Sequence, residues 1–145
     1  MKIRYMEDKD KDFVMSIDKH VDNIQYRNHV FTKSGFVLWE GNCPVGIMHY
    51  CVLWDNMPFL NLIYIKEEYR GCGFGACAMK EWEEEMKELG YKMVLISTQV
   101  DECAQHFYRK LGYTDCGGLL FNNTPLDQPM EMFMNKVIES EISID

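Results

Sequence analysis

The segment that most constrains this chain joins a dense apolar run (59–65), a glycine-rich loop (70–76) and a helical pattern that ends at Gly90. Three of the loop residues are glycines, which let backbone N–H groups face an anion that side chains would block. The helix dipole adds a positive end, and Arg70 is placed to add a full charge. A pyrophosphate could therefore bind here, although a tight glycine-rich turn without a ligand fits the same residues.

The apolar periodicity of the rest of the chain predicts an α+β fold with a mixed sheet. Gly41-Asn42 is a two-residue turn signal that joins two strands into a hairpin, and Asp55–Pro58 predicts a break before the run 59–65. Residues 20–34 carry no clear pattern. The predicted helices have apolar faces at 13–17, 78–89 and 104–111. The predicted strands are 2–6, 36–39, 45–54, 59–65, 94–97, 113–121 and 130–136.

Composition limits the kind of protein this is. A chain of 145 residues suits one domain, and its 47% hydrophobic and 26% charged residues are ordinary for a folded globule. A net charge of −8 argues against general nucleic-acid binding and is compatible with a cationic substrate. The start of the chain has no apolar leader, and no apolar run reaches membrane-spanning length, so we expect a cytoplasmic protein without a membrane partner.

Cysteine and histidine spacing gives no sign of a metal site. The six cysteines form no CxxC pair and the four histidines show no paired spacing, so we expect neither zinc nor a disulfide framework. Cys72 lies in the loop before a helix, where a thiol becomes more acidic, but we interpret it as a small residue accommodated in the turn and not as a nucleophile.

The loop Arg70-Gly71-Cys72-Gly73-Phe74-Gly75 resembles the Arg/Gln-x-x-Gly-x-Gly/Ala motif of the GNAT acyltransferase superfamily. The resemblance is specific over about residues 58–121, which include a segment similar to the family's fourth helix and sixth strand (104–113). It implies one domain over 1–145 with a C-terminal tail from about 138. Its sheet would be twisted and mostly antiparallel, with about seven strands, a central parallel pair splayed for acetyl-CoA, and about four flanking helices.

The resemblance also implies acetyl transfer from acetyl-CoA, a co-substrate, to a primary amine by direct attack in a ternary complex. Tyr108 matches the family's acid and could protonate the leaving thiolate or hydrogen-bond to it; a core aromatic is the alternative. The residues implied to contact acetyl-CoA are Ile63, Tyr64, Ile65, Arg70, Gly71, Cys72, Gly73, Phe74, Gly75, Ala76, Asp101 and Ala104.

Two positions depart from the family pattern. Asp101 stands where many members have an Asn that meets the cofactor, and we expect it to cap the fourth helix. Asn61 stands where many members have a Glu, and an amide cannot accept a proton at neutral pH. The base is therefore unassigned. The candidates are a water held by Asn61 and backbone carbonyls, the side chain of Glu40, the side chain of His49, or another group that folding brings close.

Two other functional classes stay open at this point. Gly71-x-Gly73-x-x-Ala76 formally fits a dinucleotide-binding fingerprint, although an antiparallel hairpin precedes it. A non-catalytic acyl-CoA sensor or interaction module is the other, and Asn61 is the residue that favours it. The acceptor is expected to be a small cationic amine bound by 20–34, the bend at 54–58 and the loop 121–130. The last strands could pair across a homodimer.

Overall fold

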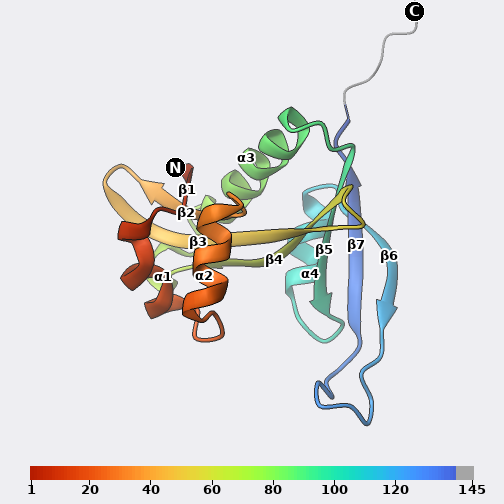
Figure 1. Cartoon of the computed structure of the whole chain (residues 1–145). Helices are drawn as coiled ribbons and strands as arrows, with labels where there is room; N and C mark the ends of the chain where they lie inside the picture. Colours follow the sequence, from red (N-terminus) through yellow and green to blue (C-terminus); the bar gives the residue numbers. More distant parts are fainter. Residues whose placement is uncertain (140–145) are drawn as a thin grey trace, which may run out of the picture. The chain divides into compact units, whose positions relative to one another are not determined.

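The computed structural model describes residues 1–139, and they form a seven-stranded sheet in the order β1-β2-β3-β4-β5-β7-β6 (Figure 1). The neighbours β4 and β5 are parallel, with Phe59 opposite Leu95. The predicted α+β fold with a mixed sheet is confirmed, and it is not the doubly wound parallel sheet that a dinucleotide-binding domain requires. The strands are β1 (Lys2–Tyr5), β2 (Gly35–Glu40), β3 (Cys43–Leu53), β4 (Met57–Ile65), β5 (Met93–Gln99), β6 (Thr114–Leu119) and β7 (Glu131–Val137).

Four α-helices accompany the sheet in the described part of the chain: α1 (Lys11–Ile17), α2 (Asn23–Phe31), α3 (Phe74–Glu88) and α4 (Ala104–Lys110). Short 3-10 turns lie at Asp8–Asp10 and Glu67–Tyr69. No helix within residues 1–139 is both long and apolar enough to cross a membrane. The chain divides into two compact units, the first unit of residues 1–51 and 60–85 and the second unit of residues 52–59 and the chain from 86 onward.

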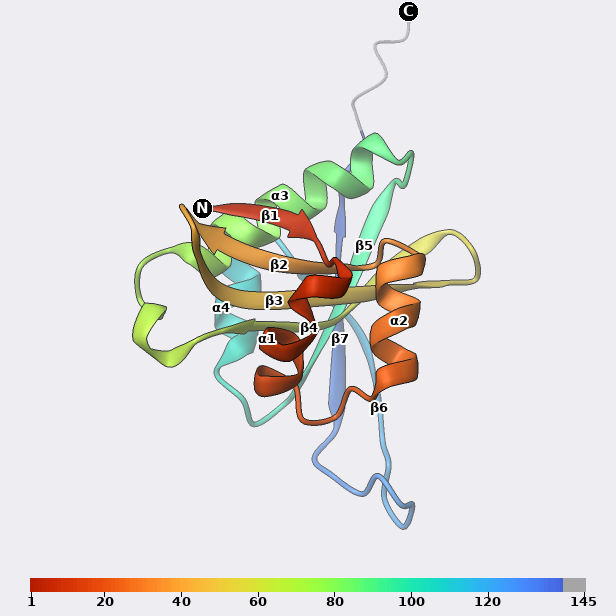
Figure 2. The ribbon, with the colours of Figure 1, turned by 60° about the vertical axis from the view of Figure 1, so that its left-hand side comes forward.

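In the first unit, alternation along the strands buries both faces of the sheet. Val37 and Ile47 lie opposite each other and pack in one core cluster with Val14 of α1 and Tyr26 of α2. Tyr50 of β3 lies on the other face of the strands, and its ring centroid lies 5.9 Å from that of Trp82 in α3. Accordingly α1 and α2 cover one face of these strands and α3 the other (Figure 2).

Helix α2 occupies the segment that showed no clear pattern. Its first turn is a capping box: Asp22 Oδ1 accepts from the Gln25 N–H at 2.8 Å, and Gln25 Oε1 accepts from the Asp22 N–H at 3.0 Å. The N–H groups of Asp22 and Gln25 thereby each gain a side-chain acceptor. The Asp-x-x-Gln signature was readable in the sequence, whereas the weakly amphipathic remainder of the segment was not.

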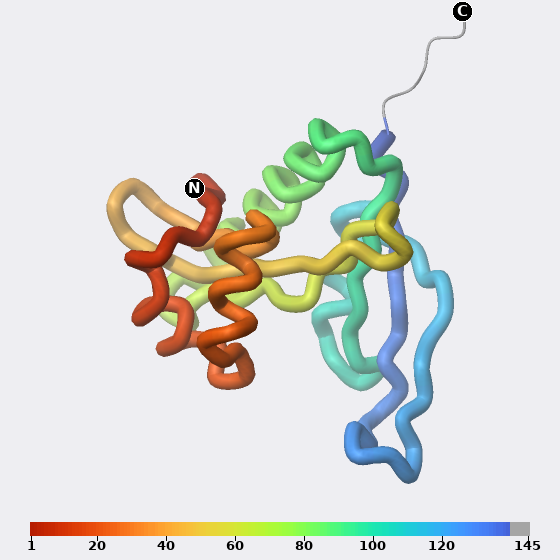
Figure 3. Tube along the Cα trace, viewed as in Figure 1, coloured from red at the N-terminus to blue at the C-terminus, as the bar shows by residue number. Residues whose placement is uncertain are grey.

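In the second unit, β7 pairs with both β5 and β6 in antiparallel register, and residues 120–130 form the long connection from β6 to β7 (Figure 3). The predicted strands 113–121 and 130–136 are both confirmed with small shifts at their ends. Ile138 continues beyond β7 as a buried residue whose N–H donates to the Lys92 carbonyl at 2.9 Å. Of the expected tail from 138, residues 140–145 lie outside the described residues, and the single-domain boundary stays a prediction.

The expected break between β3 and β4 is present, but it is a turn at 54–56 and not the longer segment Asp55–Pro58. Trp54 and Asp55 both have positive φ, 53° and 59°, and the Asn56 N–H donates to the Leu53 carbonyl at 3.1 Å. This two-residue turn joins β3 directly to β4, which begins at Met57 and includes Pro58. A turn with two positive φ angles matches the twist of the strands it joins, so it does not interrupt the sheet.

Candidate active site

The glycine loop lies in the first unit, between the end of β4 and the start of α3. Gly71 and Gly73 have φ of +78° and +81°, a conformation that residues with a Cβ rarely adopt. A Cβ added at either position would meet nothing within 4 Å, so the backbone conformation and not crowding requires glycine. The space beside these glycines is open, as a loop that takes up a ligand requires.

Helix α3 starts directly at this loop and runs for 15 residues. Its first intrahelical hydrogen bond is donated by the Cys77 N–H to the Gly73 carbonyl, at 3.2 Å. The N–H groups of Phe74, Gly75 and Ala76 precede that bond and have no acceptor within the helix, as at every helix start. These N–H groups lie at the positive end of the helix dipole, where an anionic group is stabilised.

Arg70 is tied to the end of β4. Its Nε donates to the Ile65 carbonyl at 2.9 Å, and its guanidinium carbon lies 5.1 Å from the centroid of the Tyr64 ring. Arg70 itself is exposed. The end of β4 therefore holds the Arg70 guanidinium beside the glycine loop, as the sequence predicted.

The backbone of β4 approaches β3 closely just before the loop. A Cβ at Gly46 would overlap the Tyr64 carbonyl oxygen, and the Lys66 N–H donates to the Val45 carbonyl at 2.8 Å. Glycine at position 46 is therefore required by space. This close pairing fixes Ile63, Tyr64 and Ile65, the three strand residues predicted to contact acetyl-CoA, in extended backbone.

Tyr108, the predicted acid, lies in the second unit on α4 and is buried, with 7% of its surface exposed. Its ring contacts those of Phe107 and Tyr113 edge-on, with centroids at 5.2 and 5.8 Å. Burial, and secondly the Glu102 carboxylate, raise the pKa of Tyr108 to about 12. The hydroxyl is therefore protonated throughout the neutral range and able to donate a hydrogen bond.

The expectation that Asp101 caps α4 is wrong. The helix begins at Ala104, and the residue in the capping position is Cys103, without a side-chain cap hydrogen bond. Asp101 lies two residues earlier, in a turn where the Glu102 N–H donates to the Gln99 carbonyl at 3.0 Å. Gln105 stabilises this turn instead, because its Nε2 donates to the Val100 carbonyl at 2.9 Å.

The structure separates the candidates for the base. Glu40 lies 3.1 Å from the N-terminal ammonium of Met1, and half of its side chain is exposed. His49 by contrast contacts Asn61: the Asn61 Nδ2 and His49 Nδ1 atoms are 3.3 Å apart. His49 Nε2 in turn lies 3.2 Å from Asp18 Oδ2.

Asp18, His29, His49 and Asn61 form one polar cluster. Its members come from separate elements of the first unit, which is why sequence reasoning missed Asp18 and His29. Asp18 follows α1 and His29 lies on α2, with its ring centroid 4.4 Å from that of His49. Burial lowers the pKa of His49 despite the opposing Asp18 carboxylate. Burial, and secondly His49, lower the pKa of His29 to about 4, so both rings are neutral at pH 7.

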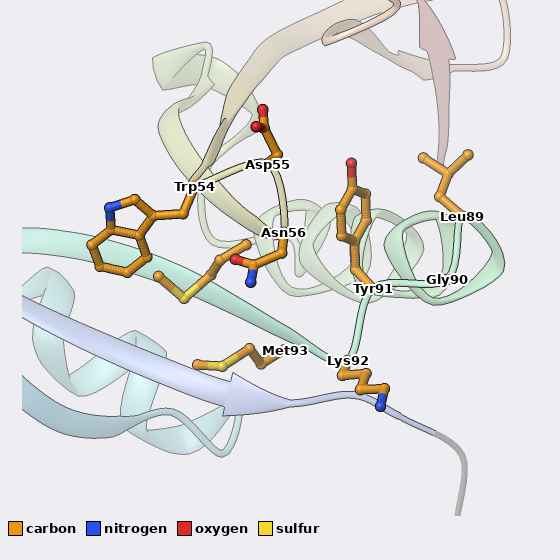
Figure 4. A pocket seen from close by; sticks show the side chains of 9 residues that line it. Trp54, Asp55, Asn56, Leu89, Gly90, Tyr91, Lys92 and Met93 are labelled. Carbon is orange, nitrogen blue, oxygen red and sulfur yellow. The ribbon is translucent and has the colours of Figure 1, made fainter.

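A pocket of about 720 Å³ lies in the second unit, at the turn between β3 and β4 (Figure 4). Trp54 and Asn56 come from that turn, whereas Leu89, Tyr91 and Lys92 come from the segment that follows α3. The bend at 54–58, one of the segments expected to contribute to an acceptor site, therefore borders a pocket.

Residues 4–113 match the model of the acetyltransferase (GNAT) family. Since the match spans more than half of the chain, this protein belongs to the GNAT acetyltransferase family. No curated protein matches the chain.

Solved structures share its fold at low identity. The ribosomal-protein-S18-alanine N-acetyltransferase of Escherichia coli is 15% identical with a TM-score of 0.76, covering 99% of this chain and 98% of that one. The spermidine/spermine N-acetyltransferase of Vibrio cholerae is 15% identical with a TM-score of 0.78, covering 94% and 92%. The yncA protein of Salmonella typhimurium, solved with acetyl-CoA, is 15% identical with a TM-score of 0.78, covering 100% and 98%.

Proposed function

We propose that this protein transfers the acetyl group of acetyl-CoA to a primary amine by direct attack. The observation that carries the proposal is the open loop at Gly71 and Gly73, which ends in the free first-turn amides of α3 and has Arg70 at its rim. In a member of the GNAT family, that arrangement suits the pyrophosphate of coenzyme A.

The proposed contacts follow from the chemistry of the ligand. Pyrophosphate oxygens accept from the backbone N–H groups of residues 71–76, and Arg70 balances their charge. The pantetheine amides pair with the backbone of Ile63 and Ile65, and Tyr64 lies between them under the guanidinium. Asp101 and Ala104 are proposed to approach the same ligand, Asp101 through its backbone because its carboxylate would repel an anion.

In the proposed reaction a neutral amine attacks the thioester carbonyl. The N–C bond forms, the C–S bond breaks, the amine nitrogen loses a proton and the departing thiolate gains one. A backbone N–H near Ile65 would stabilise the developing oxyanion.

Tyr108 is proposed to serve the leaving thiolate as a hydrogen-bond donor. Its raised pKa, about 12, lies well above the value of about 8.5 that is usual for a thiol, so the complete transfer of its proton is unfavourable. A hydrogen bond from the neutral hydroxyl still stabilises the thiolate as the charge develops.

A small cationic amine is the proposed acceptor. The net charge of −8 favours the approach of a cation. The similar N-acetyltransferases of Escherichia coli and Vibrio cholerae are named for a protein alanine and for polyamines, so both acceptor types belong in a test.

A second candidate is an acyl-CoA sensor without turnover, favoured by Asn61 in the place of a carboxylate base. The two are distinguished by incubating the protein with acetyl-CoA and one of three amines: spermidine, an aminoglycoside or a peptide with N-terminal alanine. Thiol release together with acetylated product in the mass spectrum supports the transferase. Saturable acetyl-CoA binding without product from any amine supports the sensor.

A further inference from the structure

We propose that the Asn61 side-chain oxygen accepts a hydrogen bond from the amine that is to be acetylated, and that Asp18 and His49 fix the direction in which Asn61 presents it. This inference rests on the proposed function and supplies the acceptor side of that reaction. Asn61 is on β4, two residues before Ile63 and four before Ile65, the residues proposed to pair with pantetheine.

The contacts form one hydrogen-bonded series. Asp18 Oδ2 lies 3.2 Å from His49 Nε2, and His49 Nδ1 lies 3.3 Å from Asn61 Nδ2. Asn61 Oδ1 in turn accepts from the Cys51 thiol at 3.4 Å. Each member touches the next through a different polar atom, so the orientation of one constrains that of its neighbour.

The direction of the series follows from the donor and acceptor capacity of its first member. An ionised carboxylate only accepts, so His49 carries its proton on Nε2. A neutral imidazole has one N–H, which leaves Nδ1 as an acceptor. Asn61 must therefore give its NH₂ group to His49, and its oxygen faces away from the ring.

The surroundings of His49 keep the ring neutral, which this direction requires. Its side chain is only 12% exposed, and Asp18, the one charged group in contact with it among the described residues, is 9% exposed. His29 packs beside it from α2 and is itself neutral, while Ser34 occupies His29 Nδ1 at 2.7 Å. A protonated His49 would donate at Nδ1 and reverse the Asn61 amide.

The outer end of the series is available to a solute. Asn61 and Cys51 are exposed, whereas the inner members are largely buried. The thiol that now donates to Asn61 Oδ1 is a weak donor, so an amine or ammonium N–H replaces it readily. A primary amine that donates one N–H to Asn61 keeps its lone pair for attack.

Asn61 in this scheme binds the acceptor and does not take its proton, since an amide is not a base at neutral pH. His49 and Asp18 are positioning residues. The scheme gives the Asn that replaces the usual Glu a definite task on the acceptor side.

The kinetic test compares Asn61→Leu with Cys51→Ala, using acetyl-CoA and whichever of spermidine, the aminoglycoside or the alanine peptide the wild type acetylates. Loss of one hydrogen bond to a charged or polar amine corresponds to a rise of roughly tenfold or more in the amine KM. We expect that rise in Asn61→Leu with an unchanged acetyl-CoA KM. In Cys51→Ala the amine KM stays the same or falls, because a competing donor is gone.

The positioning role has its own readout. In Asp18→Asn the new amide can give an N–H to His49 Nε2 and move the ring proton to Nδ1, so the amine KM rises as in Asn61→Leu. If that variant does not fold, the ¹⁵N shifts of the His49 ring in the wild type at pH 7.5 decide: a proton on Nε2 is expected, and a proton on Nδ1 or a charged ring overturns the series.

The outcomes separate this inference from the function beneath it. No product from any of the three amines with the wild type contradicts the proposed acetyl transfer. Turnover by the wild type with an unaltered amine KM in Asn61→Leu contradicts only the role of Asn61.

Discussion

Arg70 Nε donates a hydrogen bond to the carbonyl oxygen of Ile65 at 2.9 Å, so the residue that opens the glycine loop is fastened to the last residue of β4. The Tyr64 ring lies against the same guanidinium, at 5.1 Å. A fixed arginine loses less conformational freedom when it binds an anion than a free one would. The strand thus prepares the charge for a phosphate ligand.

Replacement of Arg70 by alanine is expected to weaken acetyl-CoA binding by roughly tenfold, because a charge-assisted hydrogen bond to phosphate is lost. Arg70→Lys keeps the charge but cannot reproduce the planar guanidinium, so its affinity for acetyl-CoA should lie between those of the wild type and Arg70→Ala. Calorimetric titration at one fixed salt concentration measures all three proteins. Acetyl-pantetheine, which lacks the pyrophosphate, serves as control and should bind each equally; an equal loss for both ligands contradicts a phosphate contact.

The two glycines on either side of the α3 start should respond oppositely to alanine. Gly73→Ala places a Cβ at a φ of +81°, and we expect the free energy of unfolding to fall by about 1–2 kcal/mol. Gly75 lies inside α3, where alanine is the better helix former, so Gly75→Ala should raise it by up to about 1 kcal/mol. Urea denaturation gives both values. A free energy of unfolding that does not fall in Gly73→Ala would show that the backbone at Gly73 tolerates a side chain.

Tyr108→Phe removes only the hydroxyl and should lower kcat by at least about tenfold while the acetyl-CoA affinity is retained. The ring contacts with Phe107 and Tyr113 persist, so the variant should fold. Because the pKa of Tyr108 is about 12, the wild-type rate should show no loss from ionisation of this hydroxyl between pH 7 and 10. Unchanged turnover in the variant would assign Tyr108 to the core alone.

Acid should destabilise the fold through His29. Its pKa is lowered from 6.5 to about 4 by burial and by His49, so the unfolded chain binds the proton more tightly. The stability that depends on the neutral ring is present above pH 6.5 and is lost as the pH falls toward 4. Urea midpoints measured from pH 7 to pH 4 should fall less steeply for His29→Gln than for the wild type. Parallel curves would mean that His29 does not titrate as its surroundings require.

Local patterns made most of the fold readable from the sequence. Gly41-Asn42 predicted the β2–β3 hairpin, and the apolar stripe of Ala78, Trp82, Met86 and Leu89 predicted α3. The first three of these residues are fully buried, whereas Leu89 follows the helix and is exposed, so that part of the stripe was wrong. The turn at Trp54-Asp55 was not predictable in the same way, because a tryptophan with positive φ contradicts its own local preference. Tertiary pairing of β3 and β4 overrides that preference.

In the candidate site, too, the local part was predictable from the sequence and the part assembled by folding was not. The glycine loop is a continuous segment, so its chemistry is visible in seven consecutive residues. The Asp18–His49–Asn61 series is assembled from a loop after α1 and two strands, and no spacing in the sequence connects them. Asn61 alone stood out, as a departure from a family pattern, and its partners became visible only in the folded chain.

The most direct test of acetyl-CoA binding is calorimetric titration of the purified wild type and of Gly73→Trp, first with acetyl-CoA and then with NAD. The account predicts saturable binding of acetyl-CoA by the wild type, loss of that binding in a folded Gly73→Trp, whose side chain fills the loop, and no binding of NAD. A folded wild type that does not bind acetyl-CoA, or one that binds NAD, would contradict it.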